Sequence, residues 1–205
     1  MGKSAELVFD FVSPNAYLVW WPLRDLCRRH GAELVVTPVF LAGMHRITGN
    51  APPMIRDRDV RGKNAYAQLE IDRFIARHGL TRYRLHPQFP FNSIGLQRML
   101  LAACEDGRGV DFAESLLRAI WEEGIDLADA GALGERIAAA GFDPQALSER
   151  AQDEGLKQRL AASTDDAVER GAFGIPTIFV PAGSGRESMF FGKERLDQVE
   201  EALAA

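Results

Sequence analysis

The sequence predicts an α/β fold in which strands stand at both ends of the chain and helices fill the middle. Two short β-rich runs, Ala5–Phe11 and Glu33–Val39, lie near the N-terminus. A helical pattern then covers most of residues 57–165, and β-rich sequence returns only after Gly174. The predicted order is βαβ, a helical block and ββα, and we expect both ends of the chain to join one sheet.

The N-terminal part is typical of a parallel strand–helix–strand unit. Its two β-rich runs contain β-branched residues and partly alternate apolar with polar positions, as strands do. Between them, Ser13 and Pro14 indicate a helix start, because serine caps a first turn and proline is favoured at the first helical position. The helix is expected to end at Gly31. The short connections favour a right-handed βαβ arrangement.

The middle of the chain is predicted to be helical after a loop. Residues 41–56 are rich in glycine and proline, which favours a loop. A helix is then expected from Asp57 to His78, followed by a connector with two prolines. Asp111 and Glu114 have the spacing of a capping box at the start of a later helix. Further helices are expected from Ser93, over Leu133–Ala140, from Pro144 and over Leu156–Val168.

The C-terminal part predicts a β-hairpin and a last helix. Ile175–Val180 and Ser188–Phe191 are strand-like, and the glycine-containing segment Pro181–Gly185 is expected to be the loop between them. Lys193–Leu203 has the pattern of a terminal amphipathic helix.

The chain has 205 residues, the length of one large domain or of a domain with a sizeable insertion. We expect residues 1–40 and 169–205 to form one domain and residues 41–168 to be an inserted helical domain. A chain of this length buries roughly 70% of its unfolded surface, so its core requires no disulfide or metal.

Composition and charge exclude several classes of protein. The residues are 46% apolar and 26% charged, as in an ordinary globular protein. Asp and Glu outnumber Lys and Arg by 29 to 24, whereas nucleic-acid-binding domains carry a basic excess. No stretch has the length and apolarity of a membrane span. The first residues carry acids within their apolar run, unlike a secretory signal, so we expect a cytoplasmic protein.

The cysteines and histidines do not indicate a metal site. Cys27 and Cys104 lie far apart and form no Cys-x-x-Cys motif, and both stand in apolar, helix-like surroundings. We expect each to be a small buried hydrophobic residue. The four histidines are scattered without the spacing of zinc ligands: His30, His45, His78 and His86.

Ser13 is the first candidate for chemistry. It follows a strand and opens a helix, the place where ligands approach an α/β sheet and where free helix N–H groups attract anions. One interpretation is a plain helix cap. As a nucleophile Ser13 looks poor, since it lacks a Gly-x-Ser-x-Gly motif and a histidine nearby in sequence. As a donor, its hydroxyl and the helix dipole would lower the pKa of a ligand's thiol from ~8.5 by about two units.

Pro176 is the second candidate. Proline cannot donate to a strand ladder and belongs at a strand start. Because only about 5–6% of X–Pro bonds are cis, the residues alone predict a trans bond. A cis bond would leave the N–H and C=O of Ile175 facing a cleft, where a peptide-like ligand can pair with them.

Six short motifs also follow one another along nearly the whole chain. They are FDFVSPNAYL at Phe9–Leu18, GNAPP at Gly49–Pro53, KNAY at Lys63–Tyr66, FPFNS at Phe89–Ser93, GAFGIPT at Gly171–Thr177 and FFGKERL at Phe190–Leu196. In this order the motifs resemble those of the 2-hydroxychromene-2-carboxylate isomerase family, whose kin are the kappa-class glutathione transferases and the DsbA-like oxidoreductases.

The resemblance implies a thioredoxin-like fold with a large all-helical insertion, in agreement with the predicted order of elements. DsbA-like relatives have Cys-x-x-Cys where this chain has Ser13–Ala16, so disulfide exchange is not expected. In the isomerase and kappa branch the serine contacts the sulfur of glutathione, which makes Ser13 the activating residue and glutathione the cofactor. The resemblance also places Asn50 and Lys63 along the glutathione site and suggests a homodimer.

Four further residues enter through the resemblance. It implies that Pro176 is cis and that Ile175 pairs with the backbone of the tripeptide. Lys193 and Glu194 stand where the family holds the γ-glutamyl end, although Ser or Asn followed by Asp is more usual there.

The function implied is a glutathione-dependent cis–trans isomerase of a small aromatic carboxylate, an aromatic-degradation intermediate of the 2-hydroxychromene-2-carboxylate type. The thiolate adds to an electron-poor carbon, the saturated bond rotates, and elimination returns glutathione. Two alternatives stay open: a kappa-class-like transferase or peroxidase that consumes glutathione, and a non-catalytic thioredoxin-like module that binds a partner.

Other polar and aromatic residues have two interpretations each. The charged segment Arg56–Lys63 is either a solvated helix start or a group of cations that holds carboxylates of glutathione and an acidic substrate. His45 is a candidate acid or base, and Tyr66 and Asn92 are candidates near the site. Four aromatic residues belong either to the core or to the wall of a pocket: Tyr17, Trp20, Trp21 and Phe40.

Overall fold

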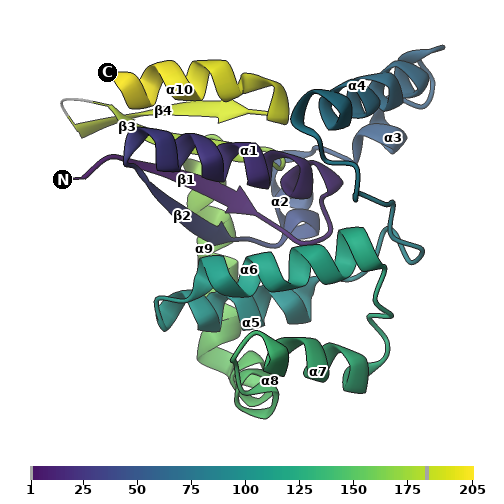
Figure 1. Ribbon diagram of the computed structural model, residues 1–205, viewed down its shortest axis with the longest axis vertical. Helices are drawn as coiled ribbons and strands as arrows, with labels where there is room; N and C mark the ends of the chain where they lie inside the picture. Colours follow the sequence, from purple (N-terminus) through teal and green to yellow (C-terminus); the bar gives the residue numbers. More distant parts are fainter. Residues whose placement is uncertain (1, 183–184) are drawn as a thin grey trace.

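The computed structural model describes residues 2–182 and 185–205, built around a four-stranded sheet of order β2-β1-β3-β4. β1 (Ser4–Phe9) pairs in parallel with β2 (Glu33–Pro38) and antiparallel with β3 (Thr177–Ala182). β3 pairs antiparallel with β4 (Arg186–Phe191). The two ends of the chain therefore share one sheet, which confirms the predicted α/β fold class (Figure 1).

Helices cover both faces of the sheet. α1 (Pro14–His30) and α10 (Leu196–Ala204) lie together on one face. α5 (Ile94–Glu105), α6 (Gly109–Arg118) and α9 (Glu154–Glu169) pack on the other, as Figure 1 shows. Beyond them lie the shorter helices α7 (Ala130–Ala139) and α8 (Pro144–Gln152). The π-helical turn η1 (Ala119–Glu123) follows α6, and the 3-10 turn η3 (Lys193–Arg195) precedes α10. The division into domains at residues 40/41 and 168/169 stays a prediction.

Local sequence accounts for several helix ends. Ser13 caps α1, with Pro14 in its first turn, and Gly31 follows in the left-handed conformation (φ 61°) that glycine adopts without strain. Asp143 likewise caps α8 through its carboxylate. These ends lie where the sequence predicts them.

The predicted loop at residues 41–56 is wrong. It contains two helices, α2 (Leu41–Thr48) and α3 (Pro53–Arg56). The glycine and proline residues end and begin these helices instead of preventing them: Gly49 closes α2 with a φ of 70°, and Pro53 stands in the first turn of α3.

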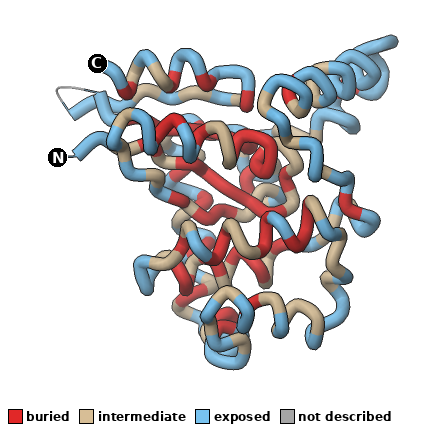
Figure 2. Tube along the Cα trace, in the orientation of Figure 1, coloured by how far each residue is buried: buried red, intermediate tan, exposed pale blue. Residues whose placement is uncertain are grey.

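The helix expected from Asp57 begins later, as α4 (Lys63–His78). Gly62 precedes it with a φ of 85°, a conformation that breaks a right-handed helix, so residues 57–62 form turns. Among the described residues, Phe74 is the only buried side chain of α4, and Figure 2 shows this helix as mostly exposed.

The capping box predicted at Asp111 and Glu114 is also wrong. α6 begins at Gly109, and the residue before it makes no side-chain cap bond. Glu114 accepts hydrogen bonds from the Trp20 indole (3.2 Å) and lies 2.9 Å from the Arg24 guanidinium, both on α1. Its carboxylate thus serves a contact between helices that sequence spacing does not reveal.

The C-terminal hairpin differs in its bounds. Pro181 and Ala182, expected in the loop, are paired residues of β3, opposite Glu187 and Arg186. The rest of the predicted loop includes residues 183–184, which lie outside the described residues. β3 begins at Thr177, so Ile175 and Pro176 precede the strand.

The core lies between β1 and the helices on both sides (Figure 2). Leu7, Val8 and Phe9 of β1 are wholly buried, as are Trp20 of α1 and Trp121 of η1. The carboxyl end of β1, where Ser13 follows, is therefore set in densely packed surroundings.

Candidate functional site

Ser13 lies at the start of α1, directly after the turn that follows β1. It has extended backbone angles (φ −86°, ψ 113°), and its Oγ accepts a hydrogen bond from the Ala16 N–H at 3.2 Å. Since the oxygen acts as acceptor, the hydroxyl proton is left to donate. The residue is 4% exposed, so a group bound to it would be shielded from water. Ser13 thus combines a donor with the positive end of a helix dipole.

Asp10 is a wholly buried acid immediately before this turn. Its two carboxylate oxygens accept from the N–H groups of Val12 (3.1 Å) and Leu41 (2.9 Å), and its carbonyl oxygen accepts from Ser13 N–H (3.0 Å). Burial raises the pKa of Asp10 to about 6, although these N–H groups favour the ionised form. The buried hydroxyl of Ser93 also lowers the pKa of the Asp10 carboxyl. Among the described residues this hydroxyl makes no hydrogen bond of good geometry.

Ile175 and Pro176 directly precede β3. The antiparallel register of β1 and β3 has Val8 and Thr177 as its last pair at this end of the two strands. The Ile175–Pro176 bond is cis, as the resemblance implies and against the base rate. Within residues 2–182 and 185–205, the N–H and C=O of Ile175 have no hydrogen-bond partner.

Asn50 contacts the segment that precedes Ile175. Its Nδ2 donates to the carbonyl oxygen of Phe173 at 2.7 Å, and its Oδ1 accepts from the Ala51 N–H. A Cβ at Gly174 would stand 3.6 Å from the Asn50 Nδ2 and 3.0 Å from the Phe191 ring. The structure therefore brings Asn50 to the chain that precedes Ile175.

Lys63 lies in a charge cluster at the start of α4. Its Nζ contacts the Asp57 carboxylate at 2.8 Å, and Arg56 holds the same carboxylate through two hydrogen bonds of 2.9 Å. Hydrogen bonds from Arg56 and then Lys63 hold the pKa of Asp57 well below its usual range. Two cations share one carboxylate, so the cluster keeps a net positive charge at the surface.

His45 lies near this cluster. Burial, and next the charge of Arg56, lower the pKa of its imidazole, so His45 is neutral at pH 7.

Lys193 and Glu194 form an ion pair in η3. The ammonium group of Lys193 also lies 5.4 Å from the centre of the Phe74 ring, and Lys193 is 5% exposed. Glu194 is the more exposed member. As it stands, the Lys193 ammonium is engaged by Glu194 and by the α4 aromatic ring.

The protein's own thiols are unsuited to nucleophilic chemistry. Burial raises the pKa of Cys27 to about 11 and that of Cys104 to about 12, so both stay protonated at neutral pH. Cys27 is buried as expected, whereas Cys104, in the last turn of α5, is partly exposed and has its Sγ 3.6 Å from the Val36 carbonyl oxygen.

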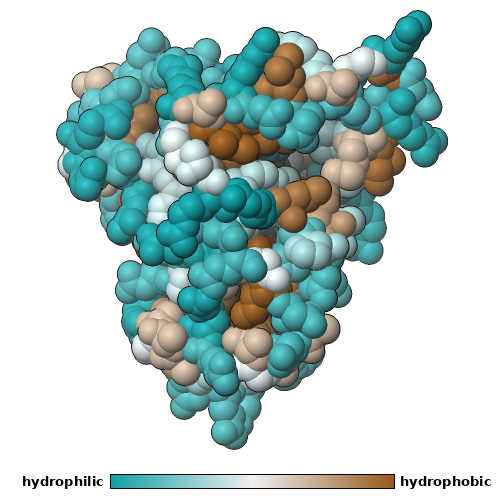
Figure 3. Space-filling model, turned by 45° about the vertical axis from the view of Figure 1, so that its right-hand side comes forward, coloured by the Kyte–Doolittle hydropathy of each residue, from teal (hydrophilic) through white to brown (hydrophobic). Residues whose placement is uncertain are grey.

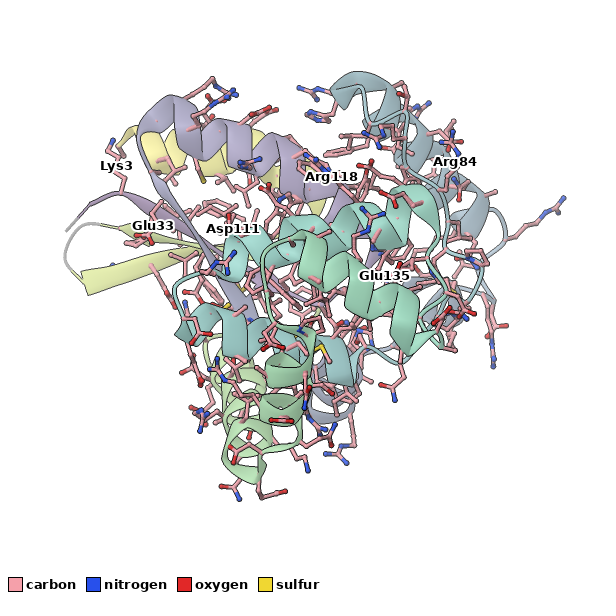
Figure 4. All side chains as sticks on the ribbon, turned by 60° about the horizontal axis from the view of Figure 1, so that its bottom comes forward. Lys3, Glu33, Arg84, Asp111, Arg118 and Glu135 are labelled. Atoms are coloured by element: carbon pink, nitrogen blue, oxygen red, sulfur yellow. The ribbon has the colours of Figure 1, made fainter. Side chains whose placement is uncertain are left out.

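The remaining candidate residues differ in how far they are buried. Tyr17 and Trp20 are core residues, each 1% exposed or less, while Tyr66 is an exposed residue of α4. The Oδ1 of Asn92 accepts from the N–H of Ile94, the first residue of α5. Trp21 is partly buried beneath the guanidinium of Arg118, 4.9 Å from its ring; Figure 4 labels Arg118 on α6, across from α1.

The sequence reasoning missed Asp10 and Asp57. An acid between two aromatic residues, Phe9 and Phe11, at the end of a strand is an available signal for Asp10, since a charged group there is forced inside. Asp57 carries no such signal, because the partners that gather on it depend on how residues 57–62 turn.

Two surface cavities lie away from Ser13. One of about 290 Å³ is lined by residues of α1, the end of α4 and α10, and one of about 360 Å³ by residues of α1, β2 and α6. The first mixes both signs of charge, with Arg29 and Arg77 beside Asp197 and Glu200. Among the helices described, none is long and apolar enough to cross a membrane.

Comparisons with known proteins agree with this architecture. A protein named 2-hydroxychromene-2-carboxylate isomerase, from Sphingobium xenophagum, is 29% identical over 214 residues, which cover 99% of both chains. Human glutathione S-transferase kappa 1 is 25% identical, covering 98% of this chain and 91% of that one. A solved structure of 2-hydroxychromene-2-carboxylate isomerase superposes with a TM-score of 0.80 at 24% identity, covering 98% of this chain and 94% of that one.

The model of one family matches residues 5–204, nearly the whole chain, and its description is that of a DSBA-like thioredoxin domain. The strand order, the helix opened by Ser13 and the cis Pro176 before β3 fit such a domain. The chain belongs to the DSBA-like thioredoxin domain family.

Proposed function

We propose that this protein is a glutathione-dependent cis–trans isomerase of a small aromatic carboxylate of the 2-hydroxychromene-2-carboxylate type. The observation that carries the proposal is the hydroxyl of Ser13 at the start of α1, in a chain whose own thiols stay protonated. Relatives named 2-hydroxychromene-2-carboxylate isomerase, 27–29% identical over nearly the whole chain, support the choice of reaction.

The candidate residues have chemical groups that suit glutathione. The N–H and C=O of Ile175, which have no hydrogen-bond partner within the part of the chain that the structure describes, suit the backbone of a tripeptide, which pairs with extended chain as an added strand does. The net positive cluster of Arg56, Asp57 and Lys63 suits a carboxylate. Asn50 adds an amide beside Phe173.

Lys193 and Glu194 are proposed to hold the γ-glutamyl end. That end is a zwitterion, and the pair presents one charge of each sign. Binding requires each member to exchange its neighbour for the opposite charge of the ligand. The side chain of Glu194 is nearly half exposed and is therefore accessible to the ammonium group of the ligand.

Ser13 has one role in this proposal. When bound, glutathione supplies a thiolate that can add to an electron-poor carbon and leave again. The Ser13 hydroxyl donates a hydrogen bond to that sulfur, and the first N–H groups of α1 stabilise its negative charge. Together these lower the pKa of the thiol by about two units, so that the thiolate prevails at neutral pH.

Two other functions are separated by simple measurements. A kappa-class-like transferase or peroxidase consumes glutathione, whereas an isomerase returns it, so the glutathione lost per turnover distinguishes them. The 25% identity to human glutathione S-transferase kappa 1 makes this the second candidate. A non-catalytic module shows no glutathione binding by calorimetry.

The proposal is tested by three substitutions of Ser13. Ser13→Ala removes both the hydroxyl and the cap, Ser13→Asp keeps a capping oxygen without a donor hydrogen, and Ser13→Thr keeps both. We expect Ala to lower kcat for isomerisation by about a hundredfold, the usual effect of removing one donor to a reacting anion, Asp to lower it at least as much, and Thr to retain most activity. If Ser13→Ala isomerises the substrate at the wild-type rate, the proposed role of Ser13 is wrong.

A further inference from the structure

Gln97 is a wholly buried amide on α5, remote in sequence from the Ser13 turn. Its Nε2 donates to the carbonyl oxygens of Phe9 (2.7 Å) and Val39 (2.8 Å), and its Oε1 accepts from the Phe11 N–H (3.3 Å). Both donor hydrogens and the acceptor are used. An amide bound through all three is held in one orientation.

These three backbone groups lie where the first two strands separate. Phe9 ends β1, Val39 follows β2, and the Val39 N–H still donates to the Phe9 carbonyl at 3.1 Å. Beyond this point one chain turns to Ser13 and the other to α2. The ladder therefore gives the Phe11 N–H no strand partner, and Gln97 supplies one.

The carbonyl of Phe11 is held from the helical side as well. The indole Nε1 of Trp121, in η1, donates to it at 3.0 Å, and Trp121 is wholly buried. Both polar backbone groups of Phe11 are thus bound by side chains from elements on one side of the sheet.

Asp10 completes the connection to Ser13. The Val12 N–H donates to the Asp10 carboxylate and the Ser13 N–H to the Asp10 carbonyl. Every N–H from Phe11 to Ser13 therefore has a partner. These hydrogen bonds hold each residue of the turn from Phe11 to Ser13. A shift of Phe11 is therefore transmitted along the turn and changes the position of Ser13.

We propose that Gln97 is a positioning residue for Ser13: its buried amide fixes the turn from Phe11 and thereby the direction of the Ser13 hydroxyl at the start of α1. The expected effect of Gln97 on the pKa of a bound thiol rests on the function proposed above. Its expected effect on the position of the turn does not. An apolar side chain of similar length would fill the same space without these bonds, so packing alone does not account for an amide here.

The test compares Gln97→Met with Ile137→Ala. The first removes the amide at nearly constant volume. The second creates a cavity at a buried position of α7, away from the turn, and controls for lost stability. Hydrogen–deuterium exchange of residues 11–16 is measured in both full-length proteins. The thiol pKa of bound glutathione is measured from its ultraviolet thiolate absorbance against pH, together with kcat and KM.

In Gln97→Met we expect selective loss of protection at residues 11–16. We also expect the pKa of the bound thiol to rise by about one unit, so that the thiolate fraction and with it kcat at neutral pH fall about threefold, with little change in KM. Ile137→Ala should change neither. Exchange that rises equally throughout both variants, or a thiol pKa that does not move in Gln97→Met, overturns the positioning role.

The two proposals fail separately. If the wild-type protein binds no glutathione, the proposed function fails, and the exchange at residues 11–16 still decides whether Gln97 holds the turn.

Discussion

The side-chain amide of Asn50 donates to the carbonyl oxygen of Phe173 across 2.7 Å and joins the loop after α2 to the segment before β3. The two residues lie far apart in the sequence, on either side of the helices α3 to α9. This bond sets Asn50 beside Ile175, whose backbone groups are proposed to meet the ligand.

Asn50→Ala is expected to weaken glutathione binding about tenfold, since both a ligand contact and the placement of Phe173 are lost. The free energy of unfolding should fall by about 1 kcal/mol or less, because the bond is exposed. Calorimetry and urea unfolding measure the two effects. Asn64→Ala is the control: Asn64 also donates to a backbone carbonyl, that of Met54, in the α3–α4 region. Equal loss of affinity in both variants would contradict the prediction.

Asp10 should make stability depend on pH. Burial raises the pKa of its carboxyl to about 6 in the folded protein, above the value of an unfolded chain. The folded state then binds more protons than the unfolded state between about pH 4 and about pH 6, so this group's contribution to stability decreases as pH rises through that window.

The comparison with Asp10→Asn isolates this effect. The free energy of unfolding of the wild type, minus that of the variant, should be larger at about pH 4 than at about pH 7. Urea unfolding across this range measures it. A difference that stays constant or grows with pH would show that the folded carboxyl titrates at or below its ordinary value.

The cysteines should be dispensable for activity. Burial keeps both thiols protonated, so the double variant Cys27→Ala, Cys104→Ala should retain glutathione-dependent turnover. Loss of the Cys27 side chain from the core should cost about 1–2 kcal/mol of unfolding free energy. Turnover with saturating glutathione is the measurement, and its disappearance in a folded double variant would implicate a protein thiol.

Arg170 should be important for stability rather than chemistry. Its guanidinium contacts Glu6 of β1 (2.7 Å) and Glu187 of β4 (2.9 Å) and lies 4.0 Å from the centre of the Phe179 ring. Arg170→Met should lower the unfolding free energy by about 2 kcal/mol, because the largely covered carboxylate of Glu6 and the more exposed carboxylate of Glu187 lose their partner. Arg136→Met, which breaks an exposed pair with Glu123, should cost about 1 kcal/mol or less. Thermal unfolding of both variants checks the contrast.

Much of the fold follows from short-range signals. Ser13, Pro14 and Gly31 define α1 through caps and turns that involve only their neighbours, and Asp143 does the same for α8. Predictions from the sequence fail where a contact with a residue far away in the sequence determines the local structure. α6 begins before Asp111, so Glu114 lies beyond its first turn and contacts Trp20 and Arg24 of α1 instead of capping its own helix.

The candidate site divides in the same way. Ser13 is visible in the sequence because its place at a strand end is local. Gln97 is not, since its role depends on Phe9, Val39 and Phe11 converging in space. The apolar side chains left outside, which include Ile47, Met54 and Ile55, are equally hard to foresee; Figure 3 shows hydrophobic groups reaching the surface in several separate places among hydrophilic residues. The predicted homodimer remains a prediction.

The single buried side chain of α4 has a consequence for motion. Within the described residues, this helix of 16 residues is held by Phe74, beside Lys193, and by Ile71 and Ile75, which are partly buried against the core. Its detachment exposes less apolar surface than the loss of β1 would, so the free energy of this local opening lies below that of global unfolding. Backbone amides of α4 should therefore exchange with solvent while those of β1 remain protected, and Lys63 can swing with the helix without disturbing the sheet.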